Sequence, residues 1–275
     1  MKSVSPEAYD KDYYLSDCTD YETFRQTQGR KLGKRLFKIL SNIKIAKGEK
    51  ILDVGSGRGE TVFYCAQKRA WVVGIDYASA AIKLAAQALT HQTQTVKKQT
   101  SFILANSKNL PFANNSFDKI LLFDIVEHLY PEELNQVMRE INRVLKPKGE
   151  LYIHTAPNKI LVDFTFPFWI RPVDWLLVSV SNLLNRKHYS KLSKKIRTDS
   201  HRLMHVNEMT FWKLSRLLNK HRFRFSIKLE HFCLKPFLSW KDKLYNCLVG
   251  LYPFSLKKPL ICFFANEFFI KARKY

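Results

Sequence analysis

The chain has 275 residues and carries 46 Lys and Arg against 24 Asp and Glu, a formal net charge of +22. This length suits one large α/β core with insertions, and the polar, tyrosine-rich residues 1–20 lead us to expect no secretory signal peptide. The five cysteines are odd in number and contain no C-x-x-C pair, which argues against a disulfide framework or a zinc knuckle and predicts a cytoplasmic protein.

The positive charge is concentrated in the second half of the chain. Residues 1–158 carry 23 basic against 17 acidic side chains, a net of +6, whereas residues 159–275 carry 23 against 7, a net of +16. The second half also contains every tryptophan except Trp71. Basic residues interleaved with bulky apolar ones predict an anionic surface as a partner.

The N-terminal part is predicted to be helical. The stretch YDKDYY at residues 9–14 precedes a single amphipathic helix over residues 21–40, with apolar side chains on one side and basic ones on another. The residues leave two roles open for these tyrosines, covering a sheet edge or covering the functional site.

The segment ILDVGSGRGE at residues 51–60 organises the rest of the chain. Its apolar run ends in Gly55, Gly57 and Gly59, a pattern that predicts a strand, a tight turn and a helix start. Glycine permits positive φ and lets a ligand lie against backbone amides. The G-x-G-x-G spacing differs from the dinucleotide fingerprint, so NAD and FAD are disfavoured.

Carboxylates flank this loop in sequence. Asp53 precedes it, and Asp76 follows the next predicted strand, residues 71–75, about where a ribose-binding acid belongs. Strands and helices then alternate, which predicts a parallel sheet with ligands at the carboxyl ends of its strands. The further strands are expected at 102–105, 116–123 and 150–155, the helices at 60–69, 78–89 and 131–146, and an unpacked connection at 91–99.

The alternation stops after Pro157. Residues 157–205 form a predicted insertion that begins apolar and ends basic, and residues 232–252 form a second one. Regular structure resumes with a helix at 207–219, a sixth strand at 221–230 and a seventh at 259–270. No uncharged run reaches the eighteen or so residues of a transmembrane helix. The aromatic residues of the first insertion suit either a membrane interface or the lining of a long acceptor pocket: Phe164, Phe166, Phe168, Trp169 and Trp175.

Four motifs occur in a fixed order: the glycine loop with Asp76, LPFANNSFD at 110–118, DIVEH at 124–128 and LKPKGE at 145–150. Over residues 45–158 they resemble the class I S-adenosylmethionine-dependent methyltransferases. The resemblance implies S-adenosylmethionine as cofactor and a Rossmann-like, seven-stranded, mostly parallel sheet with helices on both faces and an antiparallel last strand.

The resemblance also implies a domain organisation and cofactor contacts. It suggests a helical lid (1–44), a cofactor-binding core (45–158) and a C-terminal half (159–275) with insertions at 159–206 and 231–258. Asn106 and Ser107 stand where the family usually has an acidic residue facing adenine, so the chain departs from the family pattern there. The expected cofactor-binding residues are Asp53, Gly55, Ser56, Gly57, Gly59, Asp76, Tyr77, Asn106, Ser107 and Asp124.

The acceptor side offers fewer signals. A sulfonium methyl is already activated, so the protein mainly positions the reactants, and a base helps only with a protonated acceptor. His128, in the loop four residues past Asp124, is the candidate base; the alternatives are that it caps the following helix or touches only cofactor. The substrate-facing candidates are Tyr13, Tyr14, His154 and His205.

A metal site is not predicted from the sequence. His201 and His205 are four residues apart and would share a helix face, but a third ligand is missing. The other neighbours, His231 and Cys233, fit no metal motif by their spacing.

Three functions are considered. The first and favoured one is methylation of a small or a lipid- or glycan-linked acceptor by an enzyme resting on an anionic membrane surface through its basic, aromatic half. The second is an RNA methyltransferase with a phosphate-binding face, disfavoured because DIVE replaces a D/N-P-P-Y/F type tetrapeptide. The third is a non-catalytic protein that retains the fold, against which the intact Asp53, glycine loop and Asp76 argue. The sequence makes no prediction of oligomeric state.

Overall fold

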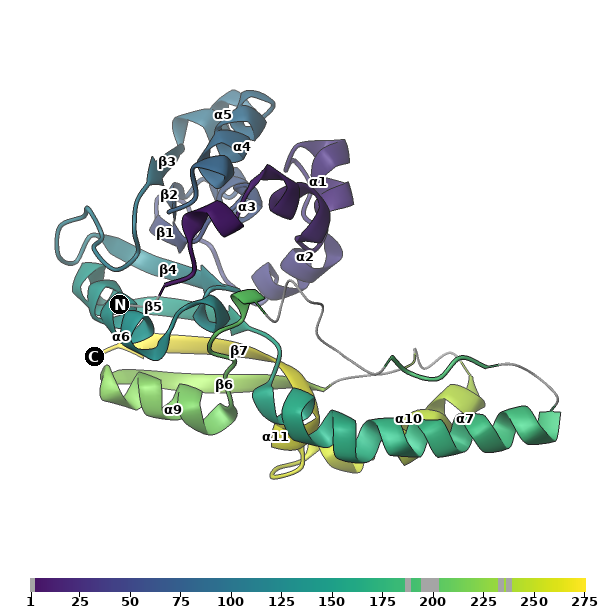
Figure 1. The fold of residues 1–275 in the computed structure, drawn as a ribbon. Helices are drawn as coiled ribbons and strands as arrows, with labels where there is room; N and C mark the ends of the chain where they lie inside the picture. Colours follow the sequence, from purple (N-terminus) through teal and green to yellow (C-terminus); the bar gives the residue numbers. More distant parts are fainter. Residues whose placement is uncertain (1–2, 186–188, 194–202, 232–234, 236–238) are drawn as a thin grey trace.

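A computed structural model describes residues 3–185, 189–193, 203–231, 235 and 239–275 (Figure 1). Within this part, seven strands form one sheet in the order β3-β2-β1-β4-β5-β7-β6. The first five strands are parallel, and β7 runs antiparallel to both of its neighbours, which confirms the predicted fold class. The strands are β1 (Lys50–Val54), β2 (Trp71–Asp76), β3 (Thr100–Leu104), β4 (Phe117–Phe123), β5 (Leu145–Thr155), β6 (Phe223–His231) and β7 (Ala265–Lys274).

Helices cover both faces of the sheet because successive strand residues point to opposite sides. Leu52 packs into a core shared with α6 and α9, whereas its neighbour Ile51 packs into a core shared with α2 and α3. The α-helices of the core are α1 (Tyr21–Thr27), α2 (Lys34–Leu40), α3 (Glu60–Gln67), α4 (Ser79–Thr90), α5 (Gln94–Lys98), α6 (Pro131–Val144), α9 (Phe211–Lys220) and α11 (Ile261–Phe264).

The N-terminal helix differs from its prediction. The expected single helix over 21–40 is two helices, α1 and α2. The break follows from the backbone, because Gln28 and Gly29 both adopt left-handed conformations, with φ of 51° and 73°. Such residues end a helix, and the chain restarts at Gly33 with an extended conformation.

Other boundaries also differ. The connection at 91–99 contains α5, because Thr93 caps the helix and Val96 is buried. The last strand begins at Ala265 rather than 259, since α11 precedes it, and the helix expected from 207 begins at Phe211 after its cap Thr210.

The two insertions pack against each other and project from the sheet (Figure 1). The first contains η4 (Leu161–Ile170) and α7 (Arg171–Asn185), and the second contains α10 (Trp240–Gly250). Phe166 of η4 and Val249 of α10 are buried in one apolar cluster. The Trp169 indole donates a hydrogen bond to the Val249 carbonyl at 3.1 Å. No helix among the described residues is both long and apolar enough to cross a membrane.

Candidate active site

A cavity of about 530 Å³ lies at the carboxyl ends of the parallel strands. Its wall includes the loop after β1, Asp76 at the end of β2, Asn106 after β3 and Asp124 after β4. This is where open α/β sheets bind their ligands. The wall formed by the described residues includes none of the five aromatic side chains of the first insertion, which does not support the long-pocket alternative.

The three loop glycines all adopt positive φ, but they serve different purposes. A Cβ at Gly55 would lie 2.1 Å from the Ile125 side chain, and one at Gly59 would lie 2.6 Å from Phe102. These two glycines therefore allow close packing. A Cβ at Gly57 would meet only Tyr14, at 3.5 Å, on the cavity side of the loop. Gly57 is thus the position where a side chain would take space from a ligand.

Two buried carboxylates lie beneath the loop. Asp76 accepts hydrogen bonds from the Gly57 and Ala78 amides, both at 3.0 Å, which fixes its carboxylate beside the loop. Asp53 is 3% exposed, and burial together with the charge of Asp76 raises its pKa to about 8. Among the described residues neither acid forms an ion pair with a basic side chain. A positively charged ligand would balance the negative charges of the two carboxylates.

The N-terminal segment supplies another part of the wall. Tyr13 and Tyr14 both line the cavity. Arg58, inside the glycine loop, donates hydrogen bonds to the Tyr14 carbonyl at 2.7 Å and the Thr19 carbonyl at 3.0 Å. The loop and the N-terminal segment are therefore joined directly by a buried guanidinium, which the sequence analysis did not single out.

The remaining cofactor candidates also lie at the cavity. Ser56, Tyr77 and Ser107 line it, and the Asn106 side-chain oxygen accepts a hydrogen bond from the Lys108 amide at 3.0 Å. The Lys108 ammonium pairs with Glu133 at 2.7 Å.

Both carboxylate oxygens of Asp124 accept hydrogen bonds from basic side chains. Arg35 of α2 binds it with two hydrogen bonds of 2.6 and 2.7 Å, and His154 Nδ1 donates a third at 2.7 Å. Burial alone would raise its pKa, but the charges of Arg35 and His154 hold the pKa of Asp124 well below its usual range. Asp124 thus lines the cavity while tying α2 to the sheet.

His154, a substrate-facing candidate from the sequence, does not line the cavity. It is 1% exposed and lies outside the cavity wall, between Asp124 and Glu267 of β7. The reason is strand geometry, because its side chain points into the charged cluster that Arg35 closes. It therefore does not face an acceptor.

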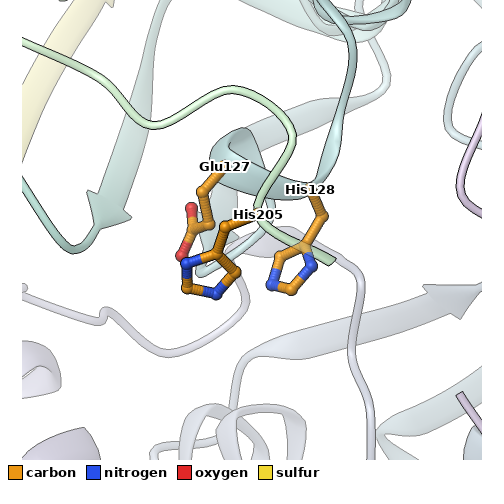
Figure 2. A group of neighbouring side chains, drawn as sticks. All are labelled: Glu127, His128 and His205. Atoms are coloured by element: carbon orange, nitrogen blue, oxygen red, sulfur yellow. The ribbon is translucent and has the colours of Figure 1, made fainter. Parts of the chain in front are cut away.

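The cavity wall also contains Glu127, His128 and His205, whose side chains lie close together (Figure 2). A carboxylate oxygen of Glu127 and one ring nitrogen from each histidine lie within 4.8 Å of one another. The two imidazole rings pack edge to face, with their centroids 4.8 Å apart. Glu127 and His128 belong to η3 (Val126–His128), directly after β4, whereas His205 comes from the loop before α9. His128 and His205 were expected near the acceptor, but Glu127 was missed.

Neighbouring side chains hold this cluster in place. Tyr9 Oη lies 2.8 Å from His128 Nδ1, and the Thr155 hydroxyl donates to Glu127 at 2.7 Å. Glu127 is 2% exposed, and burial, together with the charge of Asp124, raises its pKa to about 7. Tyr9 also was not singled out, since nothing in YDKDYY distinguishes it from the two tyrosines that follow.

Comparison with known proteins agrees with this geometry. Residues 52–153 match the family model described as a methyltransferase domain. Methyltransferase GfsG of Streptomyces halstedii is 32% identical over 126 residues, which are 46% of this chain and 43% of that protein. This chain thus matches less than half of GfsG. Phosphoethanolamine N-methyltransferase of Plasmodium falciparum is 27% identical over 191 residues, 64% of this chain and 70% of that protein.

A solved structure shows the same fold. Haemonchus contortus phosphoethanolamine N-methyltransferase 2 in complex with S-adenosyl-L-methionine superimposes with a TM-score of 0.59 at 17% identity, covering 98% of this chain and 60% of that one. The seven-stranded sheet, the glycine loop with its acid and the matching domain define a class of protein. The chain belongs to the class I S-adenosylmethionine-dependent methyltransferases.

The cavity residues fit this cofactor. Asp76, held beside the loop, would pair with the ribose hydroxyls, and Gly57 leaves room for a ligand against the backbone. The buried Asp53 would suit a positively charged group of the cofactor. The cofactor supplies an activated methyl group, and the chain's own residues position it and exclude water.

Proposed function

We propose that the protein transfers a methyl group from S-adenosylmethionine to a small-molecule acceptor. A nucleophilic atom of the acceptor forms the new bond to the methyl carbon, the S–C bond breaks, and its electron pair stays on sulfur, leaving S-adenosylhomocysteine. The acceptor atom loses its proton to the surroundings. The observation that carries this proposal is one cavity whose wall contains both the glycine loop with Asp76 and the cluster of Glu127, His128 and His205.

The cavity size and the relatives support a small acceptor. A volume of about 530 Å³ lies within the range of small-molecule sites. Two of the similar proteins are phosphoethanolamine N-methyltransferases, which favours a small molecule over a macromolecule.

We further propose that the acceptor is linked to a lipid or glycan and is met at an anionic membrane surface. Apolar side chains form an exposed stripe on α7, at Leu176, Val180 and Leu183, and another on α10, at Trp240, Leu244 and Leu248. The half of the chain that carries them has a net charge of +16. Apolar helix faces with flanking basic residues are typical of helices that lie in a bilayer interface.

Calorimetry of cofactor binding tests the core of the proposal. Gly57→Val should weaken S-adenosylmethionine binding at least tenfold, about 1.4 kcal/mol, because the side chain enters the ligand's space. Asp76→Ala should do the same because it unpairs the ribose hydroxyls. NADH should not compete.

The matched control is Asp12→Ala, an exposed carboxylate outside the cavity wall, which should bind as wild type does. Circular dichroism establishes that each variant is folded. Unchanged affinity in folded Gly57→Val and Asp76→Ala proteins would refute the cofactor assignment.

A further inference from the structure

We propose that Glu127, His128 and His205 form a binding site for one divalent transition-metal ion at the acceptor end of the cavity. Two imidazoles and one carboxylate are the protein ligand sets of open iron sites and of several catalytic zinc sites. The three side chains come from segments 77 residues apart and converge within 4.8 Å (Figure 2). Their positions in the sequence do not predict that these side chains are in contact.

The distances are compatible with an ion after a small contraction. Metal–ligand bonds of 2.0–2.2 Å place ligand atoms about 3–3.5 Å apart. The described atoms lie within 4.8 Å, so the side chains would close by roughly 1 Å or a little more. His205 lies in a loop rather than in a helix or strand, so side-chain and loop adjustment can supply this movement.

Neighbouring groups orient the three ligands through hydrogen bonds, as the residues behind the ligands do in metal sites. When His128 Nδ1 carries the proton and donates to Tyr9 Oη, Nε2 presents its lone pair to the cluster. The Thr155 hydroxyl donates to Glu127 Oε2, and Figure 2 shows a Glu127 carboxylate oxygen beside the His205 ring. The Asn207 amide donates to the Glu127 backbone carbonyl at 3.0 Å, which holds the His205 loop against η3.

A bound cation would also balance the negative charge of the buried Glu127 carboxylate. Glu127 is a buried carboxylate with Asp124 nearby, and the strongest cation there, Arg35, is already bound to Asp124. Buried charges are paired or coordinate metals. With three protein ligands, an ion keeps open positions toward the cavity, where an acceptor hydroxyl would bind and have its pKa lowered. His128 thereby becomes a metal ligand rather than the free base expected from the sequence.

Metal titration of the 275-residue protein tests this site without any assay of turnover. After chelator treatment, the protein is titrated with Co²⁺, followed by visible absorption, and with Zn²⁺, followed by calorimetry. We expect one equivalent of each to bind with a micromolar Kd. His128→Ala and His205→Ala should each weaken binding at least tenfold, and Glu127→Gln should weaken it as well.

Two controls separate this proposal from the proposed function. His91→Ala removes an exposed histidine far along the chain from the cluster and should leave metal binding unchanged. S-adenosylmethionine affinity should stay within about twofold in every variant, which reports both folding and an intact cofactor site. Binding weaker than millimolar, or binding retained when both His128 and His205 are replaced, would overturn the metal site and restore the base role of His128, while leaving the methyltransferase proposal standing.

Discussion

At the scale of single residues, the charge state of one buried acid, Asp53, should control cofactor binding. In the free protein the pKa of Asp53 is raised to about 8, so the side chain carries a proton at neutral pH. A cationic cofactor favours the carboxylate and lowers this pKa, so binding should release a proton. The affinity should therefore rise from about pH 6 to 8, by no more than tenfold per pH unit.

Proton release is measured by calorimetry at pH 7 in buffers of different ionisation enthalpy. Asp53→Asn should abolish the buffer dependence, while Asp12→Asn should preserve it. A wild-type binding enthalpy that is identical in all buffers would contradict this linkage.

His154 provides a second prediction at this scale. Burial disfavours its charged form, but the charge and hydrogen bond of Asp124, with help from Glu267, raise its pKa to about 9 from 6.5. Because the folded pKa is the higher one, this stabilisation is fully present below pH 6.5 and is lost as the pH rises through 9. The free energy of unfolding should fall over this interval by on the order of 2–3 kcal/mol.

Urea denaturation at pH 6.5 and 9.5 measures this loss. His154→Gln should be less stable at the lower pH and should show a smaller change between the two. His91→Gln is the matched control, since His91 is exposed at the end of α4 and takes no part in the charged network of Asp124. An equal pH dependence in wild type and His154→Gln would be inconsistent with the charged network.

At the scale of elements, the packed insertions are the feature that an ordinary methyltransferase core does not explain. The insertions have an apolar interior of their own, in which Leu161, Phe166 and Val249 are buried together. The buried Asp174 accepts hydrogen bonds from the Tyr245 hydroxyl and the Leu192 amide. Phe166, expected from the sequence to face either a membrane interface or an acceptor pocket, is part of this core. Phe168 and Trp175 are 71% and 56% exposed and remain available to a bilayer.

Co-sedimentation with liposomes tests this surface. Wild type should bind anionic vesicles more strongly than neutral ones, and salt should weaken the binding because Lys and Arg near the surface contribute about 1 kcal/mol each. Phe168→Ser with Trp175→Ser should reduce binding at least tenfold, since two interfacial aromatic residues are lost.

Trp212→Ser is the matched control, because this tryptophan is 49% exposed on α9, outside the insertions. RNA binding would also weaken with salt, so a parallel measurement with single-stranded RNA is needed. If the double variant binds anionic vesicles like wild type, or if only RNA binds, the interfacial proposal is wrong.

At the scale of the whole molecule, the exterior and the cavity have opposite electrostatic character. The chain is strongly basic, at +22, yet the basic side chains that line the cavity are each paired with an acid. These pairs are Arg35–Asp124, Arg58–Glu60 and Lys108–Glu133. Asp53, Asp76 and Glu127 then leave the cavity suited to cationic ligands, while the exterior suits an anionic surface.

The sequence by itself determined the sheet, the glycine loop and the second carboxylate, because each depends on local patterns of a few residues. Apolar runs, glycine spacing and an acid at a strand end are readable without knowledge of distant contacts. The same locality explains the error in the N-terminal helix, where the left-handed Gln28 accepts a hydrogen bond at its carbonyl from the distant Gln92 side chain, at 2.7 Å.

Only the tertiary structure decided which residues gather around His128. Glu127 and His205 are separated in the sequence by α6, β5 and the first insertion, and Tyr9 reaches His128 across 119 residues. It also decided that His154 turns into a charged network and that the two insertions bury Phe166 while leaving Phe168 and Trp175 outside. These outcomes depend on which surfaces pack together, a property of the whole chain that no local pattern encodes.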